Sequence, residues 1–307
     1  MSPSRPTFAS FVVTYNRPDA LRATLEGLLS QTQPADLTVV IDNGTGDESR
    51  TVAEEFGRDV EYVRTGDNLG SAGGAAFGME LLFERGYEWI HSVDDDNPTV
   101  TDDTLERLRS LIARNDDNAL GAVAAGGTRW DWRKGRSLRI PSAELTRDLA
   151  VDSIGGNQHM TTRRQVIAAH GTPRKEFFFG FWDALYCLRL RRAGYRLMID
   201  GALMHEYRTQ HNRLDFQFAR SATPRDAYES IWRRYYVTRN YIYEMRKAFD
   251  RPDLARRQAL LALGRAVTSW SRGARYGARY SNLQLRGVVD GYRGRLGRTV
   301  PPRAKPA

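Results

Sequence analysis

Short apolar runs, each followed by a polar cluster, recur along the first 100 residues of this chain. The runs rich in β-branched and aromatic residues predict three strands, at Phe8–Val13, Leu37–Ile41 and Val60–Val63. Pro18 followed by leucines at helical spacing predicts a helix after the first strand, and a second helix is predicted from about Ala72 to Glu84. Strands that alternate with helices favour a parallel sheet with helices on both faces.

A fourth apolar run, beginning at Ile90, ends in the three carboxylates Asp94, Asp95 and Asp96. Strands avoid Asp and adjacent like charges repel, so the cluster is costly unless a cation or ordered solvent compensates it. A divalent metal would do so, and an acidic surface turn is the alternative; this segment alone leaves both interpretations open. His91 and Ser92, inside the same strand, indicate that one of its faces is lined by polar groups.

Polar clusters follow each predicted strand. They are Thr14, Tyr15, Asn16 and Arg17, then Asp42-Asn43, Asp67-Asn68 and Asp94 to Asp96. Ligands of parallel α/β sheets bind at the carboxyl ends of the strands, so residues 1–100 are interpreted as a nucleotide-binding half. The loops lack the Gly-Lys-Ser/Thr of a P-loop, and residues 66–74 lack the spacing of a dinucleotide fingerprint. Kinases and NAD enzymes are therefore disfavoured.

The segment from Asn68 through Gly70 to Gly74 precedes a helix whose first turns contain only small residues. Small side chains let backbone amides and a helix N-terminus approach a diphosphate. They also allow close packing of a helix on a sheet, and the sequence does not decide between the two.

The second half of the chain carries three further candidates. Trp130 and Trp132 could stack on an acceptor, although packing in a core or hairpin is the commoner role of Trp. Asp183 lies among aromatic residues at the start of a predicted helix, where it is either a cap or a carboxylate with the raised pKa of a general base. His205, after a short strand at Leu197–Ile199, is either structural or a metal ligand.

Composition and charge narrow the class of protein. The 307 residues, 41% of them hydrophobic, suffice for one large α/β domain with or without an appendage. Cys187 is the single cysteine, which favours a reducing cytoplasm, and no apolar run approaches the roughly 20 residues of a membrane-spanning helix. Residues 251–307 contain 13 Lys and Arg against Asp253 and Asp290, so the basicity is a property of the tail. Such a tail favours anionic phosphate, on a membrane surface or on a lipid-linked substrate, over nucleic acid.

The ordered set of motifs resembles the inverting family 2 glycosyltransferases with a GT-A fold. The resemblance covers roughly residues 6–245 and rests on the Thr14 loop, Asp42, Asn68-Leu69-Gly70, the three-Asp motif, Trp182-Asp183 and His205. Within the family the chain is similar to bacterial galactofuranosyltransferases and rhamnosyltransferases. One departure is Trp182, at a position where many relatives have an acidic residue.

The resemblance implies a role for each motif. Asp42 and the Thr14 loop would hold a uridine or thymidine base. Asp94 and Asp96 would flank the donor diphosphate and, with His205, hold Mn²⁺ or Mg²⁺, while Asp95 would lie nearer the sugar. Asp183 would be the catalytic base. Asn68 and Gly70 would contact the nucleotide sugar, and Trp182, Trp130 and Trp132 the acceptor.

We therefore expect a metal-dependent inverting glycosyltransferase of the α/β class, with a GT-A domain at 1–250, an acceptor half at 101–250, a basic amphipathic helical tail at 251–300 and a disordered end at 301–307. It would transfer galactofuranose or rhamnose from a UDP- or dTDP-sugar to a lipid-linked or polysaccharide acceptor in cell-envelope glycan synthesis. It would act in the cytoplasm, held peripherally on the inner face of the membrane. A nucleotidyltransferase and a non-catalytic, membrane-associated sugar-nucleotide-binding protein are the alternatives.

Overall fold

The structure is a computed structural model that describes residues 5–155, 158–215 and 223–302. Its centre is an eight-stranded sheet in the order β3-β2-β1-β4-β9-β5-β10-β8. The strands are β1 (Phe8–Thr14), β2 (Leu37–Asp42), β3 (Val60–Arg64), β4 (Trp89–Asp94), β5 (Leu120–Ala124), β8 (Leu149–Val151), β9 (Met160–Arg163) and β10 (Arg196–Ile199). A separate hairpin is formed by β6 (Arg129–Asp131) and β7 (Arg136–Leu138).

The first four strands of this order are parallel, as the sequence predicts, so their carboxyl ends lie at one edge. Strand β9 pairs antiparallel with both β4 and β5 and joins the two halves of the sheet. The expectation of a mostly parallel central sheet is confirmed.

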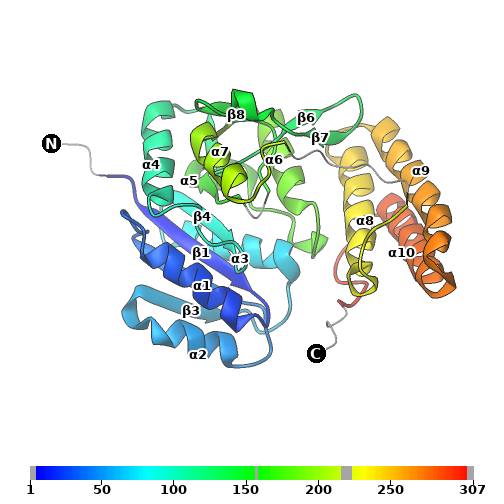
Figure 1. The fold of residues 1–307 in the computed structure, drawn as a ribbon, viewed down its shortest axis with the longest axis horizontal. Coiled ribbons are helices and arrows are strands. Elements are labelled where there is room, and N and C mark those ends of the chain that lie inside the picture. The colour runs from blue at the N-terminus through cyan, green and yellow to red at the C-terminus, as the bar shows by residue number, and fades with distance from the viewer. Residues whose placement is uncertain (1–4, 156–157, 216–222, 303–307) are drawn as a thin grey trace.

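Helices cover both faces of the sheet (Figure 1). One face packs α1 (Pro18–Leu29), α2 (Glu48–Glu55) and α4 (Thr104–Asn115) against alternate strand residues such as Val12, Val40 and Trp89. The other face packs α3 (Gly70–Glu84), α5 (Arg164–His170) and α6 (Trp182–Arg192) against Phe11, Val39 and other strand residues. This alternation along each strand is the period-2 pattern expected of a sheet buried on both sides.

Two features of α3 require glycine. Gly70 has a φ of +70°, and a Cβ there would lie 2.0 Å from the carbonyl oxygen of Phe178. Gly78 packs on the ring of Phe11, which a Cβ would approach to 2.4 Å. The small residues of this helix therefore serve close packing, one of the two roles that the sequence leaves open.

The remaining helices are α7 (Gly201–Gln210), α8 (Trp232–Lys247), α9 (Pro252–Thr268) and α10 (Ala274–Arg293). Helices α8, α9 and α10 pack together beside the sheet (Figure 1). Tyr235 of α8 donates to Asp290 of α10 at 2.7 Å, and Thr238 donates to Gln284 at 2.8 Å. The last of the helices expected in the tail, α10, is thus docked on α8 through buried polar contacts.

The chain end returns to the rest of the molecule after α10. The amide of Gly297 donates to the carbonyl of Glu176 at 2.7 Å, and Tyr236 donates to the carbonyl of Val300 at 2.6 Å. Arg298 forms an ion pair of 3.2 Å with Asp67, in the loop before α3. Of the end expected to be disordered, residues 303–307 lie outside the described residues.

Candidate active site

The carboxyl ends of β1 and β4 are joined by a buried polar cluster. Asp95 is 0% exposed; its carboxylate accepts a hydrogen bond from Thr14 Oγ1 at 2.8 Å and pairs with Arg17 at 2.7 Å. Arg17 also pairs with the exposed Asp96. Burial raises the pKa of Asp95 to about 6, against the opposing effect of Arg17 and Thr14. Asp95 therefore fixes the Thr14 loop, and its carboxylate has no exposed surface for a donor sugar.

The end of β2 is also built from buried polar groups. Asp42 is fully buried and accepts hydrogen bonds from the amide of Gly44 at 2.6 Å and from Tyr62 Oη at 2.7 Å. Asn16, with a φ of 52°, accepts from the amide of Thr45 at 3.3 Å, which ties the loop after β1 to the loop after β2. Tyr15 is exposed beside them.

Asn68 shapes the start of α3, because its side-chain oxygen accepts from the amide of Gly70 at 2.9 Å. The amide of Ala72 in the first turn donates to the carbonyl of Phe178 at 3.1 Å. This end of α3 therefore already has a protein partner in the segment that leads into α6.

The structure brings Asp94 and Asp183 to one site, although they are far apart in the sequence. The pKa of Asp94 is raised to about 7, first by burial and then by the negative charges of Asp183, Asp96 and Asp95, while Arg17 opposes the rise. The four carboxylates outnumber the single nearby cation that opposes them, Arg17, so the site carries an excess of negative charge. Such a site fits a bound cation and a group that accepts a proton.

The turn before Asp183 is held by residues to which the sequence assigned no role. Phe178, Gly180 and Phe181 all have positive φ angles, and α6 begins at the next residue. The buried Asn240 donates from Nδ2 to the carbonyls of Phe179 and Gly180 at 2.8 and 3.0 Å. Arg239, also fully buried, donates to the carbonyl of Phe177 at 2.9 Å. Helix α8 thereby holds the backbone of the turn that leads to Asp183.

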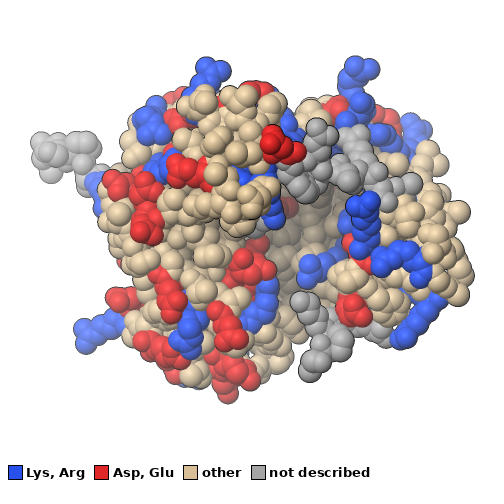
Figure 2. All heavy atoms as spheres, viewed as in Figure 1, with Lys and Arg blue, Asp and Glu red and all other residues tan. Residues whose placement is uncertain are grey.

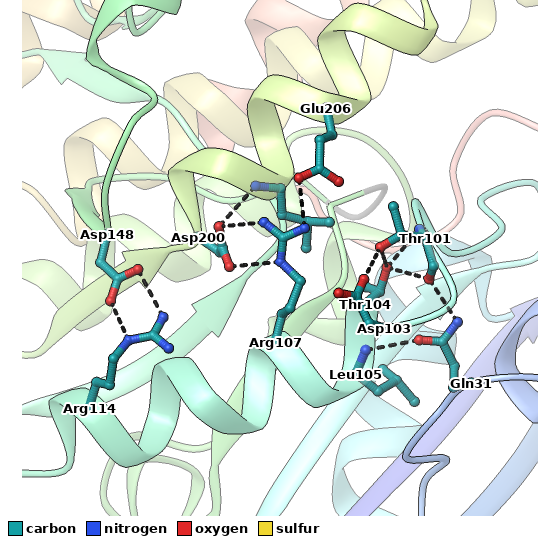
Figure 3. Close-up of polar contacts among 11 residues, drawn as sticks. Gln31, Thr101, Asp103, Thr104, Leu105, Arg107, Arg114, Asp148, Asp200 and Glu206 are labelled. Atoms are coloured by element: carbon teal, nitrogen blue, oxygen red, sulfur yellow. Dashed lines mark hydrogen bonds and ion pairs between the residues drawn. The ribbon is translucent and has the colours of Figure 1, made fainter.

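His205 lies half-buried on α7, which α4 holds in place (Figure 3). Arg107 of α4 pairs with Asp200 at 3.1 Å and with Glu206 at 2.9 Å (Figure 3). Because Asp200 is the N-cap of α7 and Glu206 lies in its second turn, Arg107 contacts α7 at two points. Asp200 also accepts from the amide of Leu203 at 2.9 Å. Within the described residues, no group of three or more His, Cys, Asp and Glu side chains is placed to hold a metal ion.

The candidate acceptor tryptophans pack mainly on other aromatic residues. Trp130 is buried and contacts Trp132 with ring centroids 6.1 Å apart, and Trp132 contacts Phe249 at 5.3 Å. Trp182 is buried and donates from Nε1 to Ser71 at 3.1 Å. Trp132 is the one of the three with an exposed surface.

The polar face of β4 continues into a buried histidine pair. His91 Nδ1 lies 2.8 Å from Ser10 Oγ, and its Nε2 lies 3.2 Å from His159 Nδ1. The side-chain amide of Asn97 lies within hydrogen-bond distance of His159 Nε2. The main-chain amide of Asn97 donates to the carbonyl of Asp94 at 3.1 Å. The pattern of β4 indicated this polar face, but His159 had no signal of its own.

Comparison with known proteins defines the class. The profile of glycosyl transferase family 2 matches residues 10–171, more than half of the chain. The chain belongs to glycosyl transferase family 2 and has a GT-A fold.

Three relatives illustrate this. The chain is 28% identical over 210 residues to galactofuranosyltransferase GlfT1 of Mycobacterium tuberculosis H37Rv, covering 63% of this chain and 68% of the relative. It is 25% identical to the glucosyl-dolichyl phosphate glucuronosyltransferase of Haloferax volcanii, over 89% of this chain and 96% of the relative. The solved mannosyltransferase PcManGT of Pyrobaculum calidifontis, in complex with GDP-Man and Mn²⁺, superposes with a TM-score of 0.57 at 15% identity, covering 95% of this chain and 89% of that one.

Proposed function

We propose that this glycosyltransferase moves a sugar, with galactofuranose or rhamnose favoured, from a UDP- or dTDP-sugar to a lipid-linked or polysaccharide acceptor, with inversion at the anomeric carbon. The observation that carries the proposal is the electrostatic coupling of Asp94 to Asp183 at the carboxyl edge of the sheet. A single carboxylate suffices to deprotonate the acceptor hydroxyl for in-line attack. The resemblance to GlfT1 supports the choice of donor sugar.

The residues at this edge fit a divalent cation. Hard cations such as Mg²⁺ are held by one or two carboxylates together with substrate phosphates, so a site need not contain three protein ligands. The uncompensated carboxylates that raise the pKa of Asp94 supply the charge. Asp94 and Asp96 would hold Mn²⁺ or Mg²⁺ together with the donor phosphates, and the cation would neutralise the charge of the departing nucleoside diphosphate. His205, the third expected ligand, forms no group of three with them in the described residues.

The chain's own residues have distinct proposed roles. Asp183 takes the proton of the acceptor hydroxyl, and Asn240 positions it through the turn before α6. Tyr15 and Asn16, together with Asp42, hold the base, and the buried Asp95 keeps Arg17 and Thr14 in place. Asn68 and Gly70 shape the wall beside the nucleotide sugar, and Trp132 offers the acceptor an aromatic surface.

Replacement of Asp183 tests the proposed base. Asp183→Asn should lower turnover by roughly 100-fold or more, because general-base catalysis contributes about 10²–10⁴-fold, while nucleotide binding persists. Asp253→Asn is a matched control, since Asp253 also lies in the first turn of a helix and should leave turnover unchanged. Unchanged turnover of Asp183→Asn would refute the assignment.

Donor identity and metal use can be measured together. In thermal-shift assays with Mn²⁺, a panel of UDP-galactofuranose, UDP-galactose, UDP-N-acetylglucosamine and dTDP-rhamnose should show the largest stabilisation for the true donor. Chelator should remove that stabilisation, and so should Asp96→Asn. Donor binding that persists undiminished in chelator would contradict the metal role.

The outer face of α9 supports a peripheral membrane contact. Leu260 and Val267, seven residues apart on α9, expose 69% and 73% of their surface, and Trp270, in the short 3-10 helix Ser269–Arg272 that follows, exposes 52%. All three lie within the strongly basic part of the chain. Figure 2 shows acidic side chains mainly over the side of the molecule that carries α1, α2 and α4, whereas Lys and Arg lie on both sides. Within the described residues, no helix is both long and apolar enough to cross a bilayer.

A liposome assay tests this contact. Leu260→Ser with Val267→Ser should reduce sedimentation with anionic vesicles, whereas Leu138→Ser, on the exposed hairpin strand β7, should not. Point substitutions are used because removal of residues 251–307 would also remove α9 and α10, which pack on α8. Equal partitioning of the double variant and the wild type would exclude this face.

A further inference from the structure

A cavity of about 290 Å³ lies beside the candidate active site, in the acceptor half of the chain. Asn97 and His159 line it on the side of β4, and the amide of Asn97 donates to the carbonyl of Asp94. Helix α7 lines it with Met204, Tyr207 and Arg208. Its size is near the lower end of the roughly 300–1,000 Å³ typical of ligand sites. Asn97 therefore connects the wall of the cavity with the end of β4 that carries Asp94.

Three arginines surround this cavity: Arg139, Arg208 and Arg213. Arg208 is 2% exposed, and its Nη1 donates to the carbonyl of Ile140 at 2.8 Å and to Ser142 Oγ at 3.1 Å. Its Nε is buried without a hydrogen-bond partner in the part of the chain that the structure describes. A buried donor that lacks a partner costs about 1–3 kcal/mol, which a ligand acceptor would recover.

The charge of the cluster is not balanced by carboxylates. In the described residues none of the three arginines has a carboxylate oxygen within ion-pair distance, although Asp215 acts on Arg139 from further away. Burial and the neighbouring charge of Arg139 lower the pKa of Arg208 to about 10. Burial and Arg213 likewise lower the pKa of Arg139. Arginines forced together in this way favour an anion between them.

We propose that this arginine cluster binds a phosphate group carried by the acceptor, and that it is a specificity site for phosphate-bearing acceptors. The inference rests on the proposed glycosyl transfer and deepens it. The planar guanidinium forks of Arg139, Arg208 and Arg213 suit phosphate oxygens. The donor diphosphate is assigned to the neighbouring carboxylate edge, so the two phosphate sites flank the point of transfer.

Kinetics with paired acceptors test the proposal. One acceptor carries a lipid-type diphosphate, and the other is an alkyl glycoside with the same sugar and no phosphate. Wild type should prefer the first, and Arg213→Gln and Arg208→Gln should each reduce that preference in kcat/KM by roughly 10- to 100-fold, the usual scale for a charge-assisted hydrogen bond. The KM of the donor should not change. An unchanged preference in both variants, or a rise in donor KM alone, would overturn the proposal.

Two further variants distinguish the loss of a phosphate contact from a general loss of stability. Arg208→Lys retains the charge and should recover part of the preference. Arg109→Gln is the matched control, because Arg109 is another arginine with a buried, unpartnered Nε and a pKa lowered to about 10, but it lies on α4 outside the cavity. Loss of preference in Arg109→Gln equal to that in Arg208→Gln would show a general effect of destabilisation.

Inorganic pyrophosphate separates this inference from the proposed function. In chelator, it should raise the melting temperature of the wild type and have a smaller effect on Arg213→Gln and Arg208→Gln. If no donor and acceptor pair reacts but this difference is found, the glycosyl-transfer proposal fails and the anion site stands. If pyrophosphate stabilises all three proteins equally, the anion site fails whatever the activity.

Discussion

The buried pair of His91 and His159 makes the stability of this protein sensitive to acid. Both rings are buried, stacked with centroids 5.3 Å apart, and joined by a contact of 3.2 Å between ring nitrogens. Burial lowers the pKa of His159 from 6.5 to about 4 and that of His91 well below its ordinary value. In the unfolded chain both histidines therefore bind protons near pH 6.5, whereas in the folded protein they remain neutral at that pH.

The size of the effect follows from this difference in pKa. Between pH 7.5 and pH 5, the unfolded state gains one proton at residue 159 and the folded state almost none, which costs about 2 kcal/mol of stability. The raised pKa values of Asp94 and Asp95 act in the opposite direction, because the folded protein binds those protons first. The comparison of a variant with the wild type at the two pH values cancels their contribution.

The perturbation is His159→Gln, and the assay is urea unfolding at pH 7.5 and pH 5. The wild type should lose about 2 kcal/mol more of its unfolding free energy over this range than His159→Gln does. His170→Gln, at an exposed position, should keep the wild-type difference. Equal losses in the wild type and His159→Gln would refute the reasoning, since residue 159 would then contribute nothing to the linkage.

Three further substitutions, two of them with a comparison variant, test other parts of the structure by chemical denaturation and initial rates. Asn240→Ala should lower turnover without changing donor affinity and cost about 1–3 kcal/mol, because it leaves the carbonyls before Asp183 without their donor. Glu244→Ala should cost about 3–5 kcal/mol, because Glu244 is fully buried and pairs with Arg174 at 3.1 Å, whereas Glu54→Ala, in an exposed pair, should cost under about 1 kcal/mol. Gly78→Ala should destabilise by about 1–3 kcal/mol through its contact with Phe11, while Gly264→Ala, which meets open space on α9, should stabilise slightly. The opposite sign in either glycine variant would contradict the packing described for these helices.

The sequence predicted the nucleotide-binding half well because its signals are local. Apolar runs followed by polar residues mark β1, β2 and β4, and parallel pairing then brings their ends together. Helix α4 was not assigned, although its leucines recur at helical spacing. Strand β9 has only four residues, Met160–Arg163, and no alternating pattern, so its antiparallel place between β4 and β5 could not be predicted.

The candidate site shows the same limit. Asp94 and Asp183 could be predicted as candidates because their residue types suggest chemistry. Asn240 and Arg208 act through partners about 60 residues away in the chain, and no local pattern encodes such contacts. The roles first expected for Asp95 and Trp130 depended on exposure, which the residue type does not determine.

The return of the chain end after α10 has a consequence for synthesis. Arg239 donates a hydrogen bond to the carbonyl of Phe177, in the segment before Asp183. The same side chain donates to the carbonyl of Gly297 at 2.7 Å. A nascent chain therefore cannot complete this support until residue 297 has been synthesised and has left the ribosome. We expect a growing polypeptide that lacks Gly297 to be inactive, because the turn before Asp183 then lacks part of its support.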